Sequence, residues 1–154
     1  MKTILKLSVL TLLLAINLIA RSLDDIKASG ELIIAVYENF PPYSFVENGE
    51  PKGIDIELGK KVANSIGVEP KWNFTGTGES LADDLRNNIW KGNTVHKNKA
   101  DIMFRVPYDY DYLRLTDKYT GALQNDLITI KSPYQSEKWI IATHKEIMPQ
   151  INTL

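Results

Sequence analysis

The sequence contains no cysteine and only two histidines among its 154 residues. A chain without cysteine forms no disulfide, offers no thiolate nucleophile and supplies no thiolate ligand to a metal. His96 and His144 lie far apart, and neither has an acidic or histidine partner at the spacing of a metal site. The chain must therefore be held together by its hydrophobic core, and we expect neither a metal nor another cofactor.

The sequence also lacks a large excess of positive or negative charge, and it lacks the common catalytic motifs. The 18 basic and 19 acidic residues nearly cancel, and no run of like charge is long enough for a nucleic-acid-binding stripe. The sequence has no glycine-rich phosphate loop, nucleophile elbow or Ser-His-Asp order. Asp83 and Asp84 are neighbours on a predicted helix, so their carboxylates point apart and are expected on a solvated face. We expect no nucleic-acid partner and no enzymatic activity.

The one long apolar run, residues 7–20, follows Lys2 and Lys6 at the N-terminus. It is too short to cross a bilayer comfortably and ends in Leu-Ile-Ala, an acceptable cleavage signal. We predict a secretory signal peptide over residues 1–20, and the alternative is an uncleaved anchor. Removing it leaves 16 basic against 19 acidic residues, a net charge of −3. The rest of the chain then has no stable membrane insertion.

A buried strand followed by an aromatic loop organises the remaining chain. Residues 32–36 are all apolar and largely β-branched, which is typical of a strand buried on both faces of a parallel sheet. Pro41 and Pro42 then end the strand. The aromatic residues Tyr37, Phe40, Tyr43 and Phe45 are thus placed at its carboxyl end, where open α/β sheets bind ligands. The alternative is that these rings only cap the core.

Helical and extended patterns alternate after this loop. Apolar residues recur every four positions over 54–66, with Asp55 as the predicted N-cap and Gly67 as the C-terminal glycine. The fold class predicted from this alternation is α/β, with a mainly parallel sheet and flanking helices on both faces. The expected helices cover 22–29, 54–66 and 80–89, and the expected strands cover 32–36, 68–74, 100–104, 126–130 and 139–143.

Four motifs in this order resemble the type II periplasmic solute-binding proteins, in particular the amino-acid type of family 3. They are Ile33–Val36, Phe40–Phe45, Lys52–Leu58 and Lys99–Met103. Residues 78–92 and 101–108 are also similar to a branch of the superfamily associated with quinoprotein (PQQ-dependent) alcohol dehydrogenases.

The resemblance implies two α/β lobes joined by hinge strands, with a small polar solute bound between them. It places a first solute-binding lobe at residues 21–125, then a hinge strand and the incomplete start of a second lobe at 126–154. The chain is therefore expected to be truncated. A periplasmic location follows from the resemblance together with the predicted signal peptide.

The resemblance also nominates ligand-binding residues. Phe40 matches the family's aromatic residue against the solute, and Tyr37 and Tyr43 stand beside it. In amino-acid binders an arginine after the third strand pairs the solute's carboxylate. Here Asp109 stands at the expected position, and Arg105 is the nearby cation that would replace the missing arginine. The alternative is that Arg105 forms a surface salt bridge with Asp109 or Asp111.

Tyr108, Tyr110 and Tyr112 recur on one side of the same loop. They form either an exposed binding patch, with Tyr108 as the ligand-binding candidate, or a surface that the second lobe covers.

Two functions remain open at this point. The first is a non-enzymatic binding protein that hands its solute to the membrane permease of an ABC transporter. The second is an accessory of a periplasmic quinoprotein dehydrogenase, which the missing arginine and the similarity of residues 78–92 favour. A third, a regulatory domain of a lytic transglycosylase, requires a catalytic domain that this sequence does not contain.

Overall fold

The computed structural model describes residues 20–92, 98–125 and 127–138. The predicted signal peptide and the predicted strand at 139–143 lie outside these residues. Inside them, no helix combines the length and the apolar character needed to cross a bilayer.

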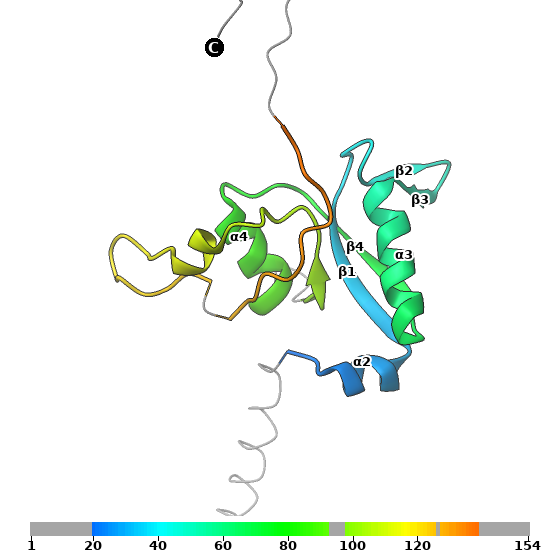
Figure 1. Ribbon diagram of the computed structural model, residues 1–154, viewed down its shortest axis with the longest axis horizontal. Helices are drawn as coiled ribbons and strands as arrows, with labels where there is room; N and C mark the ends of the chain where they lie inside the picture. The colour runs from blue at the N-terminus through cyan, green and yellow to red at the C-terminus, as the bar shows by residue number, and fades with distance from the viewer. Residues whose placement is uncertain (1–19, 93–97, 126, 139–154) are drawn as a thin grey trace, which may run out of the picture.

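A parallel sheet of three strands forms the centre of the structure (Figure 1). β1 (Glu31–Tyr37) lies between β4 (Glu69–Thr75) and β5 (Ile102–Met103), and both neighbours run parallel to it. Ile34, Ala35 and Val36 of β1 have no exposed surface. The predicted α/β class and the predicted burial of the first strand in a parallel sheet are therefore confirmed.

Helices cover the two faces of this sheet because the two crossover connections move across the sheet in opposite directions. α3 (Ile54–Ile66) carries the chain from β1 to β4 on one side. α4 (Leu81–Leu85) and the following π-helical turn η2 (Arg86–Trp90) carry it back across β1 to β5 on the other side. Right-handed crossovers in opposite directions place their helices on opposite faces, as Figure 1 shows.

The start of α3 differs from the prediction. Gly53, not Asp55, is the N-cap residue, with φ of 123° and no side-chain hydrogen bond. The first backbone N–H groups are satisfied by the aromatic loop instead: Ile54 donates to the Pro42 carbonyl at 3.1 Å and Asp55 to the Tyr43 carbonyl at 3.0 Å. These bonds fix the loop after β1 to the N-terminal end of α3.

Shorter elements complete the described chain. Ser22 forms a capping box with Asp25 at the start of α2 (Leu23–Ser29). The predicted polar turn joins β2 (Phe45–Glu47) to β3 (Glu50–Lys52) in an antiparallel hairpin. A 3-10 turn, η3 (Tyr110–Arg114), follows β5.

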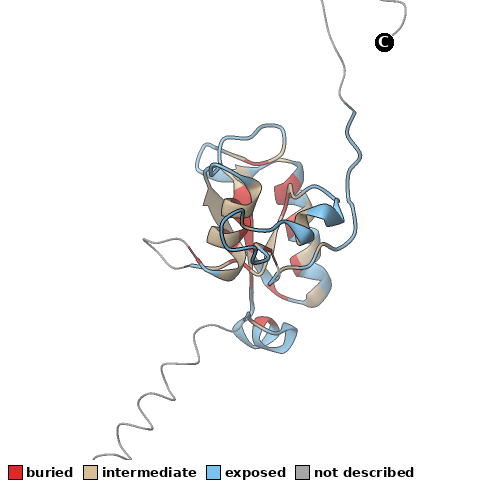
Figure 2. Cartoon of the chain, turned by 90° about the vertical axis from the view of Figure 1, so that its left-hand side faces the viewer, coloured by how far each residue is buried: buried red, intermediate tan, exposed pale blue. Residues whose placement is uncertain are grey.

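The strand predicted at 126–130 is not found in its described part. Residues 127–130 contain a turn and irregular backbone, because no described strand pairs with them. From there to residue 138 the chain is irregular and largely exposed, and this segment is pale blue in Figure 2. The buried residues, red in the same view, are concentrated in the sheet and the helices on its faces.

Candidate functional site

The carboxyl ends of β1 and β5 meet where the crossover direction reverses. In open α/β sheets this switch point is the usual position of a ligand crevice. The loop of residues 38–44 leaves β1 here, and Phe104 and Arg105 follow β5 directly.

Three rings of the loop after β1 form what we call the aromatic shelf: Tyr37, Phe40 and Tyr43. Phe40 and Tyr43 are stacked with ring centroids 5.3 Å apart, and Tyr37 meets the edge of Phe40 at 6.1 Å. The backbone holds them in place, because the Phe40 N–H donates to the Ser44 carbonyl at 2.8 Å. The fully buried Ser44 hydroxyl donates to the Tyr37 carbonyl at 2.6 Å.

Arg105 lies over this shelf. Its Cζ is 4.0 Å from the centroid of the Tyr43 ring and 5.7 Å from that of Phe40. Its side chain is 17% exposed, and its backbone has a φ of 65°. Left-handed backbone is uncommon for a residue other than glycine, and such conformations concentrate at functional sites. The structure thus brings four of the five nominated residues together.

A carboxylate already sits on this arginine. Nη1 of Arg105 lies 2.6 Å from Oε1 of Glu137. The same oxygen accepts from the Tyr43 hydroxyl at 3.1 Å and from the Gln135 amide at 3.0 Å. The hydrogen bond from Arg105 lowers the pKa of Glu137. Arg105 and Tyr43 thus both donate to one carboxylate oxygen. The pair with Glu137 takes the place of the salt bridge to Asp109 or Asp111 that the sequence suggested.

A second carboxylate, that of Asp55, lies buried beside the arginine. Its Oδ1 accepts from the Tyr134 hydroxyl at 3.2 Å, and that hydroxyl also accepts the Arg105 backbone N–H at 3.1 Å. Its Oδ2 has no hydrogen-bond partner among the described residues. Asp55 has no exposed surface, and burial raises its pKa. A donor brought to Oδ2 would find an unoccupied acceptor.

Asp55 and Tyr134 were missed as site residues. Asp55 was interpreted as a helix cap, although it lies within the Lys52–Leu58 motif that carries the family resemblance. Nothing in the sequence marks Tyr134, because it lies 29 residues after Arg105 in a segment without a recognisable pattern.

The Tyr37 hydroxyl is occupied by the scaffold. It donates to Oδ2 of Asp84 at 2.7 Å, and Oδ1 of Asp84 accepts the Gly78 N–H at 2.6 Å. Burial, with a smaller effect of Asp84, raises the pKa of Tyr37. The prediction of a solvated face for Asp83 and Asp84 is therefore wrong for Asp84, which is 5% exposed because it ties β1 to the loop before α4.

Tyr108 lies apart from this group in the described chain. Its ring meets that of Tyr110 edge-on at 5.5 Å, and their hydroxyl oxygens are 3.4 Å apart. Both side chains are about half exposed, at 51% and 50%. The pair forms a small exposed aromatic surface, and within the described chain no hydrogen bond or cation–π contact joins it to Arg105.

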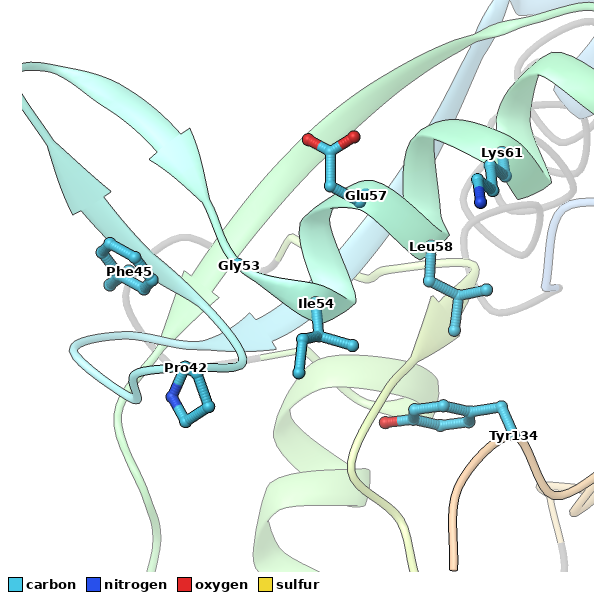
Figure 3. Close-up of a pocket in the computed structure, with 8 residues that line it drawn as sticks. All are labelled: Pro42, Phe45, Gly53, Ile54, Glu57, Leu58, Lys61 and Tyr134. Carbon is cyan, nitrogen blue, oxygen red and sulfur yellow. The ribbon is translucent and has the colours of Figure 1, made fainter.

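Tyr134 also lines a pocket of about 650 Å³ (Figure 3). Figure 3 shows Leu58 of α3 facing the Tyr134 ring, with Ile54 beside the hydroxyl. Glu57 and Lys61 are the charged residues of its wall, which is lined by Pro42, Phe45, Gly53, Ile54, Glu57, Leu58, Lys61 and Tyr134. Tyr134 therefore belongs both to the Arg105 site, through its hydroxyl, and to the wall of this mainly apolar pocket.

Comparison with known proteins identifies the family to which this chain belongs. Residues 32–115, more than half of the chain, match the model of the bacterial extracellular solute-binding proteins, family 3. These residues contain the three-stranded sheet except Glu31, together with the aromatic shelf and Arg105.

Individual relatives match only in part. A membrane-bound lytic murein transglycosylase F from Actinobacillus succinogenes is 28% identical over 89 residues, 56% of this chain and 18% of the relative, so the chain spans less than a fifth of that protein. The arginine-bound domain 1 of the T. maritima protein ArgBP is 35% identical over 42% of this chain and 51% of its own, with a TM-score of 0.37. An ancestral cyclohexadienyl dehydratase is 33% identical over 44% of this chain and 29% of its own, with a TM-score of 0.38.

Proposed function

Because this chain belongs to the bacterial extracellular solute-binding proteins of family 3, we propose that its Arg105 site binds a small polar solute through a carboxylate. The observation that carries the proposal is the carboxylate of Glu137, held by Arg105 at 2.6 Å and by the Tyr43 hydroxyl at 3.1 Å. The site therefore has the donors that a carboxylate needs.

The geometry favours a planar anion with an apolar part. One face of the guanidinium rests against Tyr43, so the N–H groups at its edge are the ones that meet a carboxylate, as they meet that of Glu137. Arginine is suited to this task because its fork of N–H groups matches the two oxygens of a carboxylate. Phe40 is 39% exposed, so its ring offers a surface to the solute's carbon skeleton. Tyr37 supports this ring from its edge.

In this proposal, residues 21–125 supply one wall of the binding site, and the protein acts in the periplasm after cleavage of residues 1–20. The solute then passes to the membrane permease of an ABC transporter. A single wall buries less of a ligand than small-molecule sites normally do, so weak binding is expected.

Isothermal titration of the purified protein with the common amino acids and short carboxylic acids tests the proposal. We expect at least one carboxylate to bind, and we expect Arg105→Ala to abolish the binding. Arg114→Ala is the matched control, because Arg114 is 81% exposed and pairs with Asp111 within η3. If no carboxylate binds, or if both substitutions weaken binding equally, Arg105 is not the solute's anchor.

A further inference from the structure

The candidate site is occupied by the protein itself. We call residues 134–137 the tail segment. Glu137 lies on Arg105, Gln135 donates to the Tyr43 hydroxyl at 3.2 Å, and Tyr134 lies between Asp55 and the Arg105 backbone. The Arg105 guanidinium, the Tyr43 hydroxyl and Oδ1 of Asp55 are therefore paired with the tail segment, whereas Oδ2 of Asp55 has no partner among the described residues.

We propose that the tail segment is an internal competitor that the solute must displace, and that Asp55 then requires a hydrogen-bond donor from the solute. The inference rests on the proposed function of the Arg105 site. The solute's carboxylate replaces that of Glu137, and a solute N–H or O–H group replaces the Tyr134 hydroxyl at Asp55. The site thus selects a carboxylate that carries a nearby donor.

The contacts of the tail segment are weak enough to be exchanged. Residues 131–138 are all exposed and form no helix or strand. The Glu137 side chain is 47% exposed, so water and salt screen its ion pair. Tethering nevertheless keeps this carboxylate at a high effective concentration beside Arg105. The tail segment therefore lowers the apparent affinity for a solute without blocking the site permanently.

Asp55 determines what kind of solute can replace the tail segment. Its Oδ2 is unpaired already, and removing Tyr134 would leave Oδ1 unpaired too. A buried carboxylate without hydrogen bonds is costly. A solute with a carboxylate alone would have to leave Asp55 in that state, whereas a solute with an additional amino or hydroxyl group would satisfy it.

Three four-carbon probes separate these requirements: butyrate, 2-hydroxybutyrate and L-2-aminobutyrate. We expect the two probes with a donor to bind the purified protein more tightly than butyrate. Glu137→Gln should raise the affinity of the donor-bearing probes about two- to fivefold, the range of a partly exposed ion pair. Glu47→Gln is the matched control, because Glu47 is 55% exposed and pairs with Lys52 across the β2–β3 hairpin. If the unmodified protein, Glu137→Gln and Glu47→Gln bind these probes with equal affinity, the tail segment does not compete with the solute. If butyrate binds more tightly than the two donor-bearing probes, Asp55 does not require a donor.

Proteolysis without any solute tests the tail segment independently. Trypsin should cleave after the exposed Lys131 faster in Glu137→Gln and in Tyr134→Phe than in the unmodified protein. Tyr134→Phe keeps the ring against Phe104 and removes the hydroxyl, and Tyr119→Phe, at an 84% exposed tyrosine, is its control. Unchanged cleavage in both variants would overturn the inference. If no probe binds any variant, the proposed function fails, while the cleavage rates still judge the tail segment.

Discussion

The guanidinium of Arg105 lies 4.0 Å from the centre of the Tyr43 ring, and both residues contact one oxygen of Glu137. Two loops that follow different strands of the sheet thus meet on one carboxylate. Tyr43 fixes the plane of the arginine, and its hydroxyl adds a second donor. This arrangement explains why an arginine can be held in a left-handed backbone conformation at this position.

Arg105→Lys tests whether the shape of this cation matters as well as its charge. Lysine keeps the positive charge and loses both the planar stacking on Tyr43 and the two-pronged hydrogen bond. We expect the affinity for a carboxylate solute to fall about tenfold, equivalent to ~1.4 kcal/mol, by isothermal titration. Arg114→Lys should leave the affinity unchanged. Full binding by Arg105→Lys would mean that the site recognises charge alone.

Gly53→Ala tests how the aromatic loop is fixed to α3. A Cβ at Gly53 would lie 2.1 Å from the Tyr43 carbonyl oxygen, and the φ of 123° is unfavourable for alanine. Gly49→Ala is the control, because Gly49 has a φ of 84° but no atom within 4 Å of an added Cβ. We expect a loss of about 1 kcal/mol in unfolding free energy for Gly49→Ala, and of at least ~2 kcal/mol more for Gly53→Ala, by urea titration. Equal losses would show that the loop yields easily.

The central part of the fold was predictable because its signals are local. The uninterrupted apolar run of β1 and the four-residue period of α3 each reflect burial of the element itself. Gly67 ends α3 in a left-handed conformation, as the pattern predicted. These elements, taken in order, are enough to predict a parallel sheet and the loop at its carboxyl edge.

The parts that failed depend on contacts between distant residues. The cap of α3 was wrong because carbonyl groups of the aromatic loop, not a side chain, satisfy its first N–H groups. The strand predicted at 126–130 is not found over its described residues, 127–130, because extended backbone becomes a strand only beside a partner. Glu137 lies 94 residues after Tyr43, so no sequence pattern places it on the shelf. The relation to quinoprotein dehydrogenases stays a prediction.

Arg21→Ala tests a contact at the opposite end of the sheet. Asp101, whose side chain is 7% exposed, accepts from Arg21 Nε at 2.9 Å and from the Ile33 N–H at 2.8 Å. Loss of the arginine leaves this carboxylate buried without its counter-ion. We expect a loss of about 1–3 kcal/mol in unfolding free energy. Arg86→Ala, which breaks a more exposed pair with Asp83 within one helical stretch, should cost under ~0.5 kcal/mol. Similar losses would argue against a structural role for Arg21.

Asp55→Asn tests the buried carboxylate through the pH dependence of stability. Burial raises the pKa of Asp55, against the weaker opposing effects of Tyr134 and Arg105. The folded protein therefore holds this proton more tightly than the unfolded chain, whose aspartates titrate near pH ~3.9. The resulting stabilisation is complete below that pH and is lost as the pH rises through the raised pKa.

The unfolding free energy of the unmodified protein should accordingly contain a component that falls from pH 4 upward and is missing in Asp55→Asn. Urea titrations at pH 4, 5, 6 and 7 measure the difference between the two proteins, which should shift in favour of the variant as the pH rises. Asp24→Asn removes an exposed carboxylate on α2 and controls for the change in net charge. Parallel pH profiles of the unmodified protein and Asp55→Asn would mean that the Asp55 carboxylate is as well stabilised in the folded protein as in water, which would also remove its need for a donor from the solute.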